Sequence, residues 1–246
     1  MAQWGKLSFA QKNCLSAVGK LMQKSGQIAP GARVGVAVSG GVDSFTMLQV
    51  LRYRQRIVPF DFELMVLHVN PGFAPDSHRP LAEWVTAHGL SAHFELTNFG
   101  LDAHSEVNRK NSPCFYCAWN RRKRFFELCR RYGLTHLALG HTAQDLVTTF
   151  FMNIFQGGKV QGLSGKEPFF GGELTLIRPM LLLDKPMIVR AAKAWGLPIW
   201  ENVCPSAKDS RRDDTYQWLA ARWQEHKKMK NAVYNAVLRW QLDLGL

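Results

Sequence analysis

Three cysteines stand in two short motifs that could hold a metal. Cys114 and Cys117 are three residues apart in NSPCFYCAWNRRKRF, and Cys204 follows in NVCPSA. Structural zinc usually takes four ligands, and these motifs offer three. A cubane iron–sulfur cluster on three thiolates leaves one iron open, whereas a redox pair needs a thioredoxin-like context that is absent here. Arg121, one turn after Cys117, favours ionised sulfur, and we predict a catalytic role for it.

The segment SGGVDS could bind phosphate. Gly40 and Gly41 let the backbone turn tightly and approach a ligand, and Ser39 and Ser44 add hydroxyl donors. The free N–H groups at the start of the following helix make an anion site. Asp43 needs a cation beside it, because a carboxylate repels phosphate, so we predict that it acts through Mg²⁺ or caps the helix. Neither the Walker loop nor the dinucleotide fingerprint is present.

Polar residues after two later apolar runs complete the set of candidate site residues. Gly140, His141 and Asp145 lie in LGHTAQD, and His68 lies in LMVLHVN. We predict Asp145 as a Mg²⁺ ligand or a general acid/base. Gly140 and His141 are expected beside the nucleotide, although His141 is equally compatible with a packing role. His68 and the following NPGF are expected to line an adenine pocket through backbone groups.

Alternating apolar segments must position these residues. Continuous apolar runs predict five strands, at residues 34–38, 62–70, 91–96, 134–140 and 174–180. Helical spacing predicts helices at residues 4–25, 45–54, 81–90, 114–133, 143–158 and 185–197, and from Asp213 to the end. Together they predict an α/β fold, a parallel five-stranded sheet with helices on both faces. Ligands of such sheets bind beyond the carboxyl ends of the strands.

The connecting segments and the ends complete this outline. Residues 99–113 are predicted to be irregular, and residues 198–203 form a last strand-like piece before Cys204. Within the helix that carries Cys117, Cys129 is expected to be buried, and so is Cys14 in the first helix. Trp119 is expected in the core, with stacking on a flipped base as the functional alternative.

The charge balance points to a polyanionic partner. The chain has 31 basic and 19 acidic residues, a net charge of +12, and nucleic acid is the first expectation for such a surface. Six cations lie on the helix after the cysteines: Arg121, Arg122, Lys123, Arg124, Arg130 and Arg131. Phosphate contacts would give affinity without choosing a base. A generally basic, solvated surface is the structural alternative.

The chain shows no pattern of a secreted or membrane protein. Its first residues have no apolar run of the signal-peptide type, and no run of 18 apolar residues exists. The five cysteines are an odd count. These features predict a cytoplasmic protein, where clustered cysteines bind metal more often than they form disulfides.

The order of the motifs resembles one known family. SGGVDS looks like the PP-loop, SGGxDS, of ATP pyrophosphatases, and it is followed by HVNPGF, the CxxC helix, LALGHTAQD, FFMNIFQGGKVQGL, IRPML and NVCPSA. This order resembles the TtcA family of tRNA 2-thiocytidine synthetases, with TtuA-type tRNA thiouridine synthetases as relatives. The likeness divides the chain into an N-terminal helical segment (1–30), a PP-loop ATPase domain with an iron–sulfur site (31–212) and a C-terminal helix (213–246).

The resemblance implies the cofactors, partners and reaction. A [4Fe–4S] cluster would be held by Cys114, Cys117 and Cys204, and ATP with Mg²⁺ by the PP-loop. ATP would adenylate the C2 carbonyl of a tRNA base, AMP would leave and sulfur would take its place, giving 2-thiocytidine at position 32 of the anticodon loop. The partners would be tRNA and a sulfur donor, either a cysteine desulfurase or free sulfide. Many such enzymes are dimers, so a homodimer is expected, without a membrane contact.

Three motifs depart from the family pattern, and two other functions stay open. SGGKDS has lysine where this chain has Val42, GHHxDD appears as GHTAQD, and CNLCGSQ appears with one cysteine, Cys204. One alternative is a PP-loop sulfurtransferase for another tRNA base or a small molecule. The other is a non-catalytic, zinc-stabilised protein that binds nucleic acid.

Overall fold

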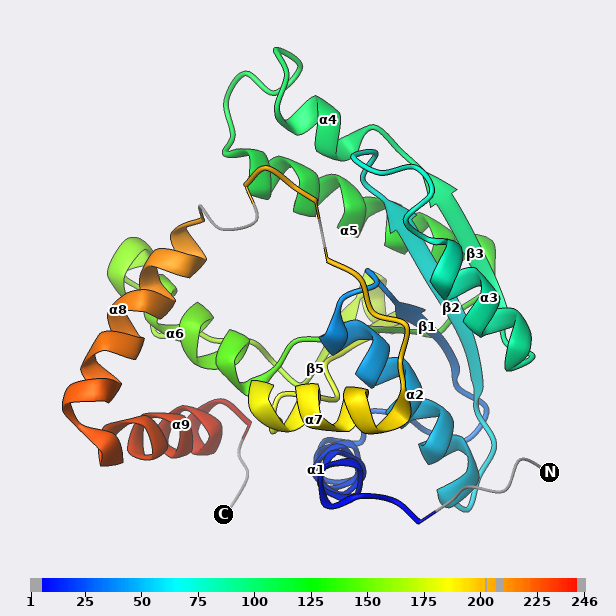
Figure 1. Cartoon of the computed structure of the whole chain (residues 1–246), viewed down its shortest axis with the longest axis horizontal. Coiled ribbons are helices and arrows are strands. Elements are labelled where there is room, and N and C mark those ends of the chain that lie inside the picture. The colour runs from blue at the N-terminus through cyan, green and yellow to red at the C-terminus, as the bar shows by residue number, and fades with distance from the viewer. Residues whose placement is uncertain (1–5, 202, 207–209, 243–246) are drawn as a thin grey trace.

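A single sheet forms the centre of the molecule (Figure 1). The computed structural model describes residues 6–201, 203–206 and 210–242. The order of the strands is β3-β2-β1-β4-β6-β5. Their bounds are β1 Arg33–Ala37, β2 Glu63–Asn70, β3 Ser91–Leu96, β4 His136–Ala138, β5 Lys166–Phe169 and β6 Leu174–Ile177. The α/β prediction is confirmed.

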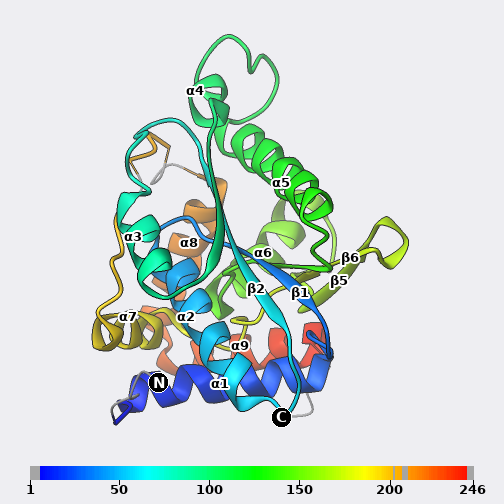
Figure 2. The same ribbon diagram turned by 90° about the vertical axis from the view of Figure 1, so that its right-hand side faces the viewer.

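The sheet has six strands, so the prediction of five was wrong. The five expected strands run parallel, and β5 pairs with β6 in the antiparallel direction. The added strand is the four-residue segment KEPF at the edge, with alternate residues exposed. Such a segment carries no apolar run, and Pro168 is tolerated because an edge strand has unpaired N–H positions. Figure 2 shows the β5–β6 hairpin projecting from the sheet.

Helices cover both faces of the sheet. The first face carries α1 (Phe9–Ser25), α2 (Val42–Ile57), α3 (Arg79–Ala87) and α7 (Lys185–Trp195). The second carries α5 (Pro113–Arg131), whose Phe125, Leu128 and Cys129 pack on strand residues such as Leu67 and Leu137. Beyond the sheet, α6 (Ala143–Gly157), α8 (Arg211–Glu225) and α9 (Lys227–Leu242) share a third core.

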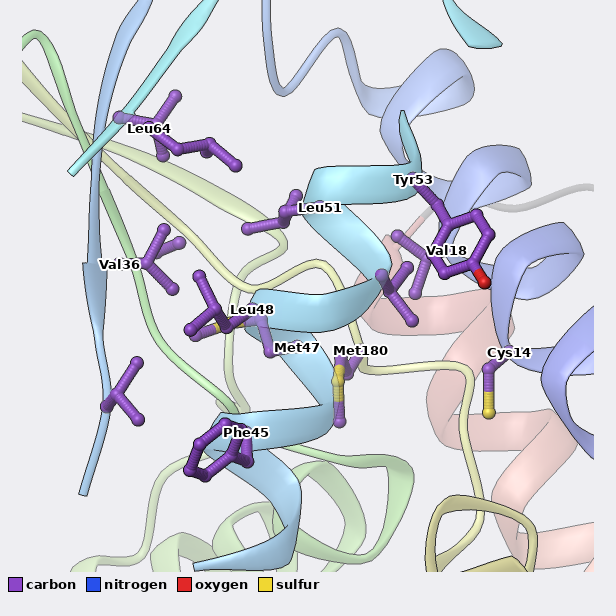
Figure 3. Packing of buried hydrophobic residues seen from close by; sticks show 14 of the residues in the cluster. Cys14, Val18, Val36, Phe45, Met47, Leu48, Leu51, Tyr53, Leu64 and Met180 are labelled. Atoms are coloured by element: carbon purple, nitrogen blue, oxygen red, sulfur yellow. The ribbon is translucent and has the colours of Figure 1, made fainter. Parts of the chain in front are cut away.

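The helix α2 is the central element of the first core (Figure 3). Its Leu48 and Leu51 point toward Val36 and Leu64 of the sheet, and Tyr53 lies on the side of α1. Because α2 is buried on nearly all sides, its N-terminus, and with it the SGGVDS loop, is held in a fixed position. Removal of such apolar surface from water is the main favourable term in folding.

The chain order creates a natural ligand site between two strands. Strands β1, β2 and β3 extend in one direction from the centre, whereas β4 pairs on the other side of β1. Parallel sheets bind ligands at the carboxyl ends of the strands where this order reverses. SGGVDS follows β1, and GHTAQD follows β4.

Three predicted segments were wrong. Residues 99–113 were expected to be irregular, but Phe99–Ala103 form helix α4. Residues 198–201 and 203 form no strand, and Asn202 lies outside the described residues. The single C-terminal helix is two helices that break at His226 (φ −131°, ψ 86°), and residues 243–246 of the predicted helix are outside the described part.

Buried and exposed side chains confirm two predictions and correct a third. Cys14 and Cys129 are fully buried, as expected. Trp119 is 56% exposed rather than part of the core. In the part of the chain that the structure describes, no helix combines the length and the apolar composition needed to span a bilayer.

Candidate nucleotide and cysteine site

The SGGVDS loop is held by hydrogen bonds among its own atoms. The backbone N–H of Ser39 donates to Ser44 Oγ at 3.0 Å, and Ser44 Oγ donates to the carbonyl of Gly41 at 3.1 Å. Gly41 is the N-cap of α2 and has no side chain to satisfy the first helical N–H groups. Those donors are therefore left for a ligand, as in other anion sites at helix starts.

A tryptophan covers the turn of this loop. Gly40 has φ +91°, and a Cβ at this position would lie 2.0 Å from the ring of Trp200. The Trp200 backbone N–H donates to the carbonyl of Gly40 at 3.2 Å. Only glycine fits here, because both the backbone angle and the space exclude a side chain. The loop and the segment before Cys204 are thus in direct contact.

Asp43 faces a lysine from a distant helix and does not cap α2. Lys185 Nζ, at the start of α7, donates to Asp43 Oδ2 at 2.5 Å. Burial raises the pKa of Asp43, whereas the hydrogen bond and charge of Lys185 lower it. The other oxygen, Oδ1, is shielded from solvent without a hydrogen-bond partner. A carboxylate with one vacant buried oxygen is suited to a metal ion.

His68 presents an acceptor nitrogen to a small cavity. Its Nδ1 lies 2.7 Å from the carbonyl of Val38, so Nδ1 carries the proton and donates. Its Nε2 is buried without a partner, and burial lowers the pKa of His68 to about 4. The cavity, of about 60 Å³, includes Ser39, Asn70, Arg121 and Trp200 among its lining residues. The prediction that His68 lines an adenine pocket through backbone groups stays a prediction.

Asp145 and His141 lie at the start of α6. Asp145 completes a capping box with Thr142, whose N–H donates to Asp145 Oδ2 at 2.8 Å. Its other oxygen accepts from Arg212 of α8 at 3.1 Å. His141 Nδ1 is shielded and without a partner. Burial lowers the pKa of His141, and the charge of Asp145 acts in the opposite direction.

Gly140 brings this second loop against the first. A Cβ on Gly140 would lie 3.1 Å from the backbone of Ser44. The charge of Asp145 also contributes to the raised pKa of Asp43. Two carboxylates at one sheet edge can share a divalent cation.

The cysteine segments approach each other at the start of α5. Ser112 caps this helix and accepts from the Phe115 N–H. Cys114 Sγ lies 3.8 Å from the carbonyl oxygen of Ser206, two residues after Cys204. The Ser206 hydroxyl lies 2.8 Å from His104 Nε2 of the α4 end. The segment that carries Cys204 is therefore seated on α4 and α5.

Burial outweighs the cationic environment at Cys117. It raises the pKa of this thiol, the charge of Arg121 lowers it, and the charges of Cys204 and Cys114 raise it further. Arg121 thus acts on Cys117 in the expected direction, but burial has the larger effect. In the described residues, no three Cys, His, Asp or Glu side chains are already grouped as metal ligands. The donor set, three thiols on two facing segments, still suits an iron–sulfur cluster better than four-coordinate zinc.

The cations of α5 divide into three groups. Arg121 is turned inward and lines the cavity beside His68. Arg124 pairs with Glu95 and Glu127. Four cations of this helix are exposed: Arg122, Lys123, Arg130 and Arg131. For Arg121 and Arg124 the prediction that the cations of this helix face a partner is therefore corrected.

Two exposed aromatic rings flank the cysteines. Phe115 and Trp119 stack at 6.2 Å with an interplanar angle of 14°, and each is 56% exposed. Residues four apart share one face of a helix, and Arg122 continues the same stripe. A flat apolar surface beside a cation is what a nucleobase with its phosphate needs.

Sequence reasoning missed three contributors, which reach the site by tertiary packing. They are Lys185 at Asp43, Trp200 at Gly40 and Arg212 at Asp145. Arg212 belongs to the basic excess of the chain but to none of its motifs. Nothing local distinguished Lys185 or Trp200 from other residues of their segments.

Comparison with known proteins gives a consistent set of relatives. A match to the PP-loop domain family spans residues 11–212. The tRNA-cytidine(32) 2-sulfurtransferase of Citrifermentans bemidjiense is 31% identical, over 93% of this chain and 92% of that protein. The protein of the same name from Geobacter sulfurreducens is 29% identical, over 96% of this chain and 94% of that protein.

Solved structures share the fold. The U34-tRNA thiolase NcsA from Methanococcus maripaludis, solved with its [4Fe-4S] cluster, has a TM-score of 0.74 and 20% identity, over 99% of this chain and 87% of that one. An NH3-dependent NAD synthetase from Campylobacter jejuni has a TM-score of 0.52 and 14% identity, over 97% and 95%. At these identities the likeness concerns the fold alone.

Proposed function

Since the chain belongs to the PP-loop domain family, and within it to the family of the tRNA-cytidine(32) 2-sulfurtransferases, we propose that it is an ATP- and cluster-dependent tRNA thiolase. Its product is 2-thiocytidine at position 32, and its partners are tRNA and a sulfur donor, either a cysteine desulfurase or free sulfide. The three-part division of the chain, the cytoplasmic location and the homodimer are parts of the same proposal.

One observation carries this proposal. A single cavity is lined by Ser39 of the PP-loop, Arg121 of α5 and Val203 of the segment before Cys204. The cavity therefore brings together the nucleotide loop, the helix that carries Cys114 and Cys117, and the segment that precedes Cys204. Convergent polar groups around a cavity are the usual basis of an active site.

The reaction follows from the chemistry of the base. The C2 carbonyl of cytidine is a poor electrophile, so its oxygen attacks the α-phosphorus of ATP and pyrophosphate leaves. A sulfur nucleophile then forms a bond to C2, and the C2–O bond breaks as AMP departs. The thiolated base loses the proton brought in with sulfur. Atoms and charge balance with ATP and hydrosulfide as the only reactants.

Named side chains fit these steps. The N–H groups of Gly41 and the start of α2 bind the leaving pyrophosphate. His68 lines the pocket for adenine, with Nδ1 held as a donor to the Val38 carbonyl. Asp43 and Asp145 hold Mg²⁺, and Arg121 offers positive charge to the acceptor oxygen. A cluster on Cys114, Cys117 and Cys204 would supply the activated sulfur.

Helix α5, which carries two of the thiols, also presents a stacking surface for the tRNA. Phe115 and Trp119 alternate along α5 with the two cysteines, and they are exposed. Base–aromatic stacking contributes about 1–3 kcal/mol per base. Trp119→Ala should therefore raise the KM for tRNA about 10- to 100-fold and leave the KM for ATP unchanged. Trp119→Phe should recover most of the loss, and an unchanged KM for tRNA in Trp119→Ala would remove this surface from the proposal.

The function is tested in cells by nucleoside mass spectrometry. In tRNA from a strain without this protein, 2-thiocytidine should disappear while other thionucleosides persist. Loss of a different thionucleoside would redirect the proposal to another base. Persistence of every thionucleoside would reject tRNA thiolation.

A further inference from the structure

The PP-loop of this chain lacks a cation at the position where its sequence family carries one. Val42 stands in place of the lysine of SGGKDS, and it packs on the core around α2. Asp43 follows it directly, at the start of α2, where the proposed function places the polyphosphate. Without a positive charge nearby, that carboxylate would repel the nucleotide.

A lysine from α7 reaches the same carboxylate. Lys185 Nζ contacts Asp43 Oδ2 at 2.5 Å, although the two residues are 142 positions apart in sequence. Both side chains keep part of their surface accessible, 42% for Lys185 and 29% for Asp43. An ammonium group has three donors, so Lys185 can bond Asp43 and still turn an N–H toward a phosphate oxygen.

The structure directs Lys185 to Asp43 rather than to its nearer acidic neighbour. Asp184 caps α7 by accepting from the Lys185 backbone N–H at 3.1 Å. Its second oxygen accepts from Lys230 of α9 at 3.2 Å. The start of α7 is fixed in turn by packing of this helix on α1 and α2. Contacts of α7 with α1 and α2, and of Asp184 with α9, thus hold Lys185 at the loop.

The second oxygen of Asp43 is left without a partner by the contact with Lys185. Its Oδ1 is shielded and without a partner, so Lys185 occupies one oxygen and leaves the other for Mg²⁺. The carboxylate can then bind the metal without net repulsion of the polyphosphate. In this way the lysine positions Asp43 and adds charge at the same point.

We propose that Lys185 is the cation of this PP-loop, replacing the lysine that the sequence lacks at Val42. It neutralises Asp43 when ATP enters and orients this carboxylate beside the β- and γ-phosphates. The inference rests on the proposed function, since it assumes that the loop binds ATP. It assigns a positioning role to a residue outside every motif of the sequence.

Variants that remove the positive charge at Lys185, or return it at Val42, test this role. Lys185→Met should weaken Mg–ATP binding about 10- to 100-fold, the range for loss of a hydrogen bond between charged groups. Lys185→Arg should keep most of the affinity. In the Lys185→Met background, Val42→Lys should restore the affinity to within about threefold of the unmodified protein, because the charge returns to the loop by the other route.

The measurement is equilibrium binding of Mg–ATP to the anaerobically purified full chain, with inorganic pyrophosphate as a second probe. Lys193→Met removes the same charge from the last turn of α7 and is the matched control, expected to bind normally. Melting temperatures report whether each variant folds. A purely structural role for Lys185 predicts that Val42→Lys restores nothing.

Two results would overturn the inference while the proposed function stands. One is normal Mg–ATP binding by Lys185→Met. The other is a folded Val42→Lys/Lys185→Met variant with no gain in affinity over Lys185→Met. If the unmodified protein binds no ATP, the proposed function itself fails, and the role of Lys185 falls with it.

Discussion

The PP-loop and the cysteine segments meet at one cavity but are organised to different degrees. In the loop, Ser39, Gly41 and Ser44 bond to one another, and Trp200 fixes the turn. At the other end, Cys114 reaches the Cys204 segment through the Ser206 carbonyl. The described thiols are not grouped as ligands.

This difference indicates how each half of the site becomes ordered for binding. A loop whose hydroxyls and amides are already positioned loses little entropy when phosphate binds, so it can bind nucleotide by itself. Thiols on two segments gain their arrangement from the metal, and binding of the metal then adds to local stability. We therefore expect a substitution in the loop to impair nucleotide binding alone, and a substitution of a cysteine to impair metal binding alone.

The largest effect should come from the cysteines. Cys114→Ser, Cys117→Ser and Cys204→Ser should each abolish iron binding and thiolation, since a serine hydroxyl is a poor ligand for iron. Mg–ATP binding should stay within about twofold, because the loop is formed without the metal. Cys14→Ala and Cys129→Ala, at buried positions, are the controls and should retain iron. Iron retention in any of the three serine variants would remove that cysteine from the site.

A substitution in the turn of the loop should have the opposite effect to a cysteine substitution. Gly40→Ala places a methyl group on the ring of Trp200 at a backbone angle of φ +91°, with strain of about 1–3 kcal/mol from the angle alone. Mg–ATP binding should be lost while bound iron is retained. Gly41→Ala meets only Ser39 Oγ at 3.6 Å and should fold normally. Equal melting temperatures for the two variants would contradict this account of the loop.

A smaller effect should separate catalysis from structure at Asp145. This residue caps α6 and pairs with Arg212, so Asp145→Asn should cost about 1 kcal/mol of stability through the cap. If Asp145 also binds Mg²⁺ or moves a proton, thiolation should fall about 100-fold or more. Single-turnover rates and denaturant unfolding measure the two effects. If the thiolation rate falls no further than the lost free energy of unfolding explains, only the structural role of Asp145 remains.

The last prediction concerns the pH dependence of stability. The pKa of His68 is about 4 in the folded protein because of burial, against an ordinary value of about 6.5. The unfolded chain therefore binds a proton first, and the free energy of unfolding should fall as pH drops from about 6.5 to 4, by at most about 3 kcal/mol. His68→Gln should flatten this slope. An unchanged slope would mean that His68 is accessible to protons when folded.

Local motifs predicted the α/β fold and supplied the candidate site residues. Val-rich runs, helical spacing and SGGVDS each depend on residues close in sequence, so the five parallel strands and the loop after β1 were readable. The edge strand KEPF was not, because its pairing with β6 supplies what its composition lacks. The break at His226 likewise arises where α9 turns to pack on α6 and α8.

The missing parts of the site depend on contacts between distant segments. Lys185 and Trp200 reach the loop only after α7 packs on α1 and α2. Trp119 was misjudged because α5 buries Phe125, Leu128 and Cys129 in its second half, while its first half extends past the core. A helical period alone does not tell where along a helix the core ends.

The central claim is that both halves act in one thiolation reaction. The direct measurement is mass spectrometry of nucleosides after anaerobic incubation of the iron-loaded protein with tRNA, Mg–ATP and sulfide. The account predicts 2-thiocytidine with the unmodified protein, and none when ATP is omitted or when the Cys204→Ser protein is used. The account would be contradicted if cytidine stayed unmodified although the protein is shown to bind both iron and ATP.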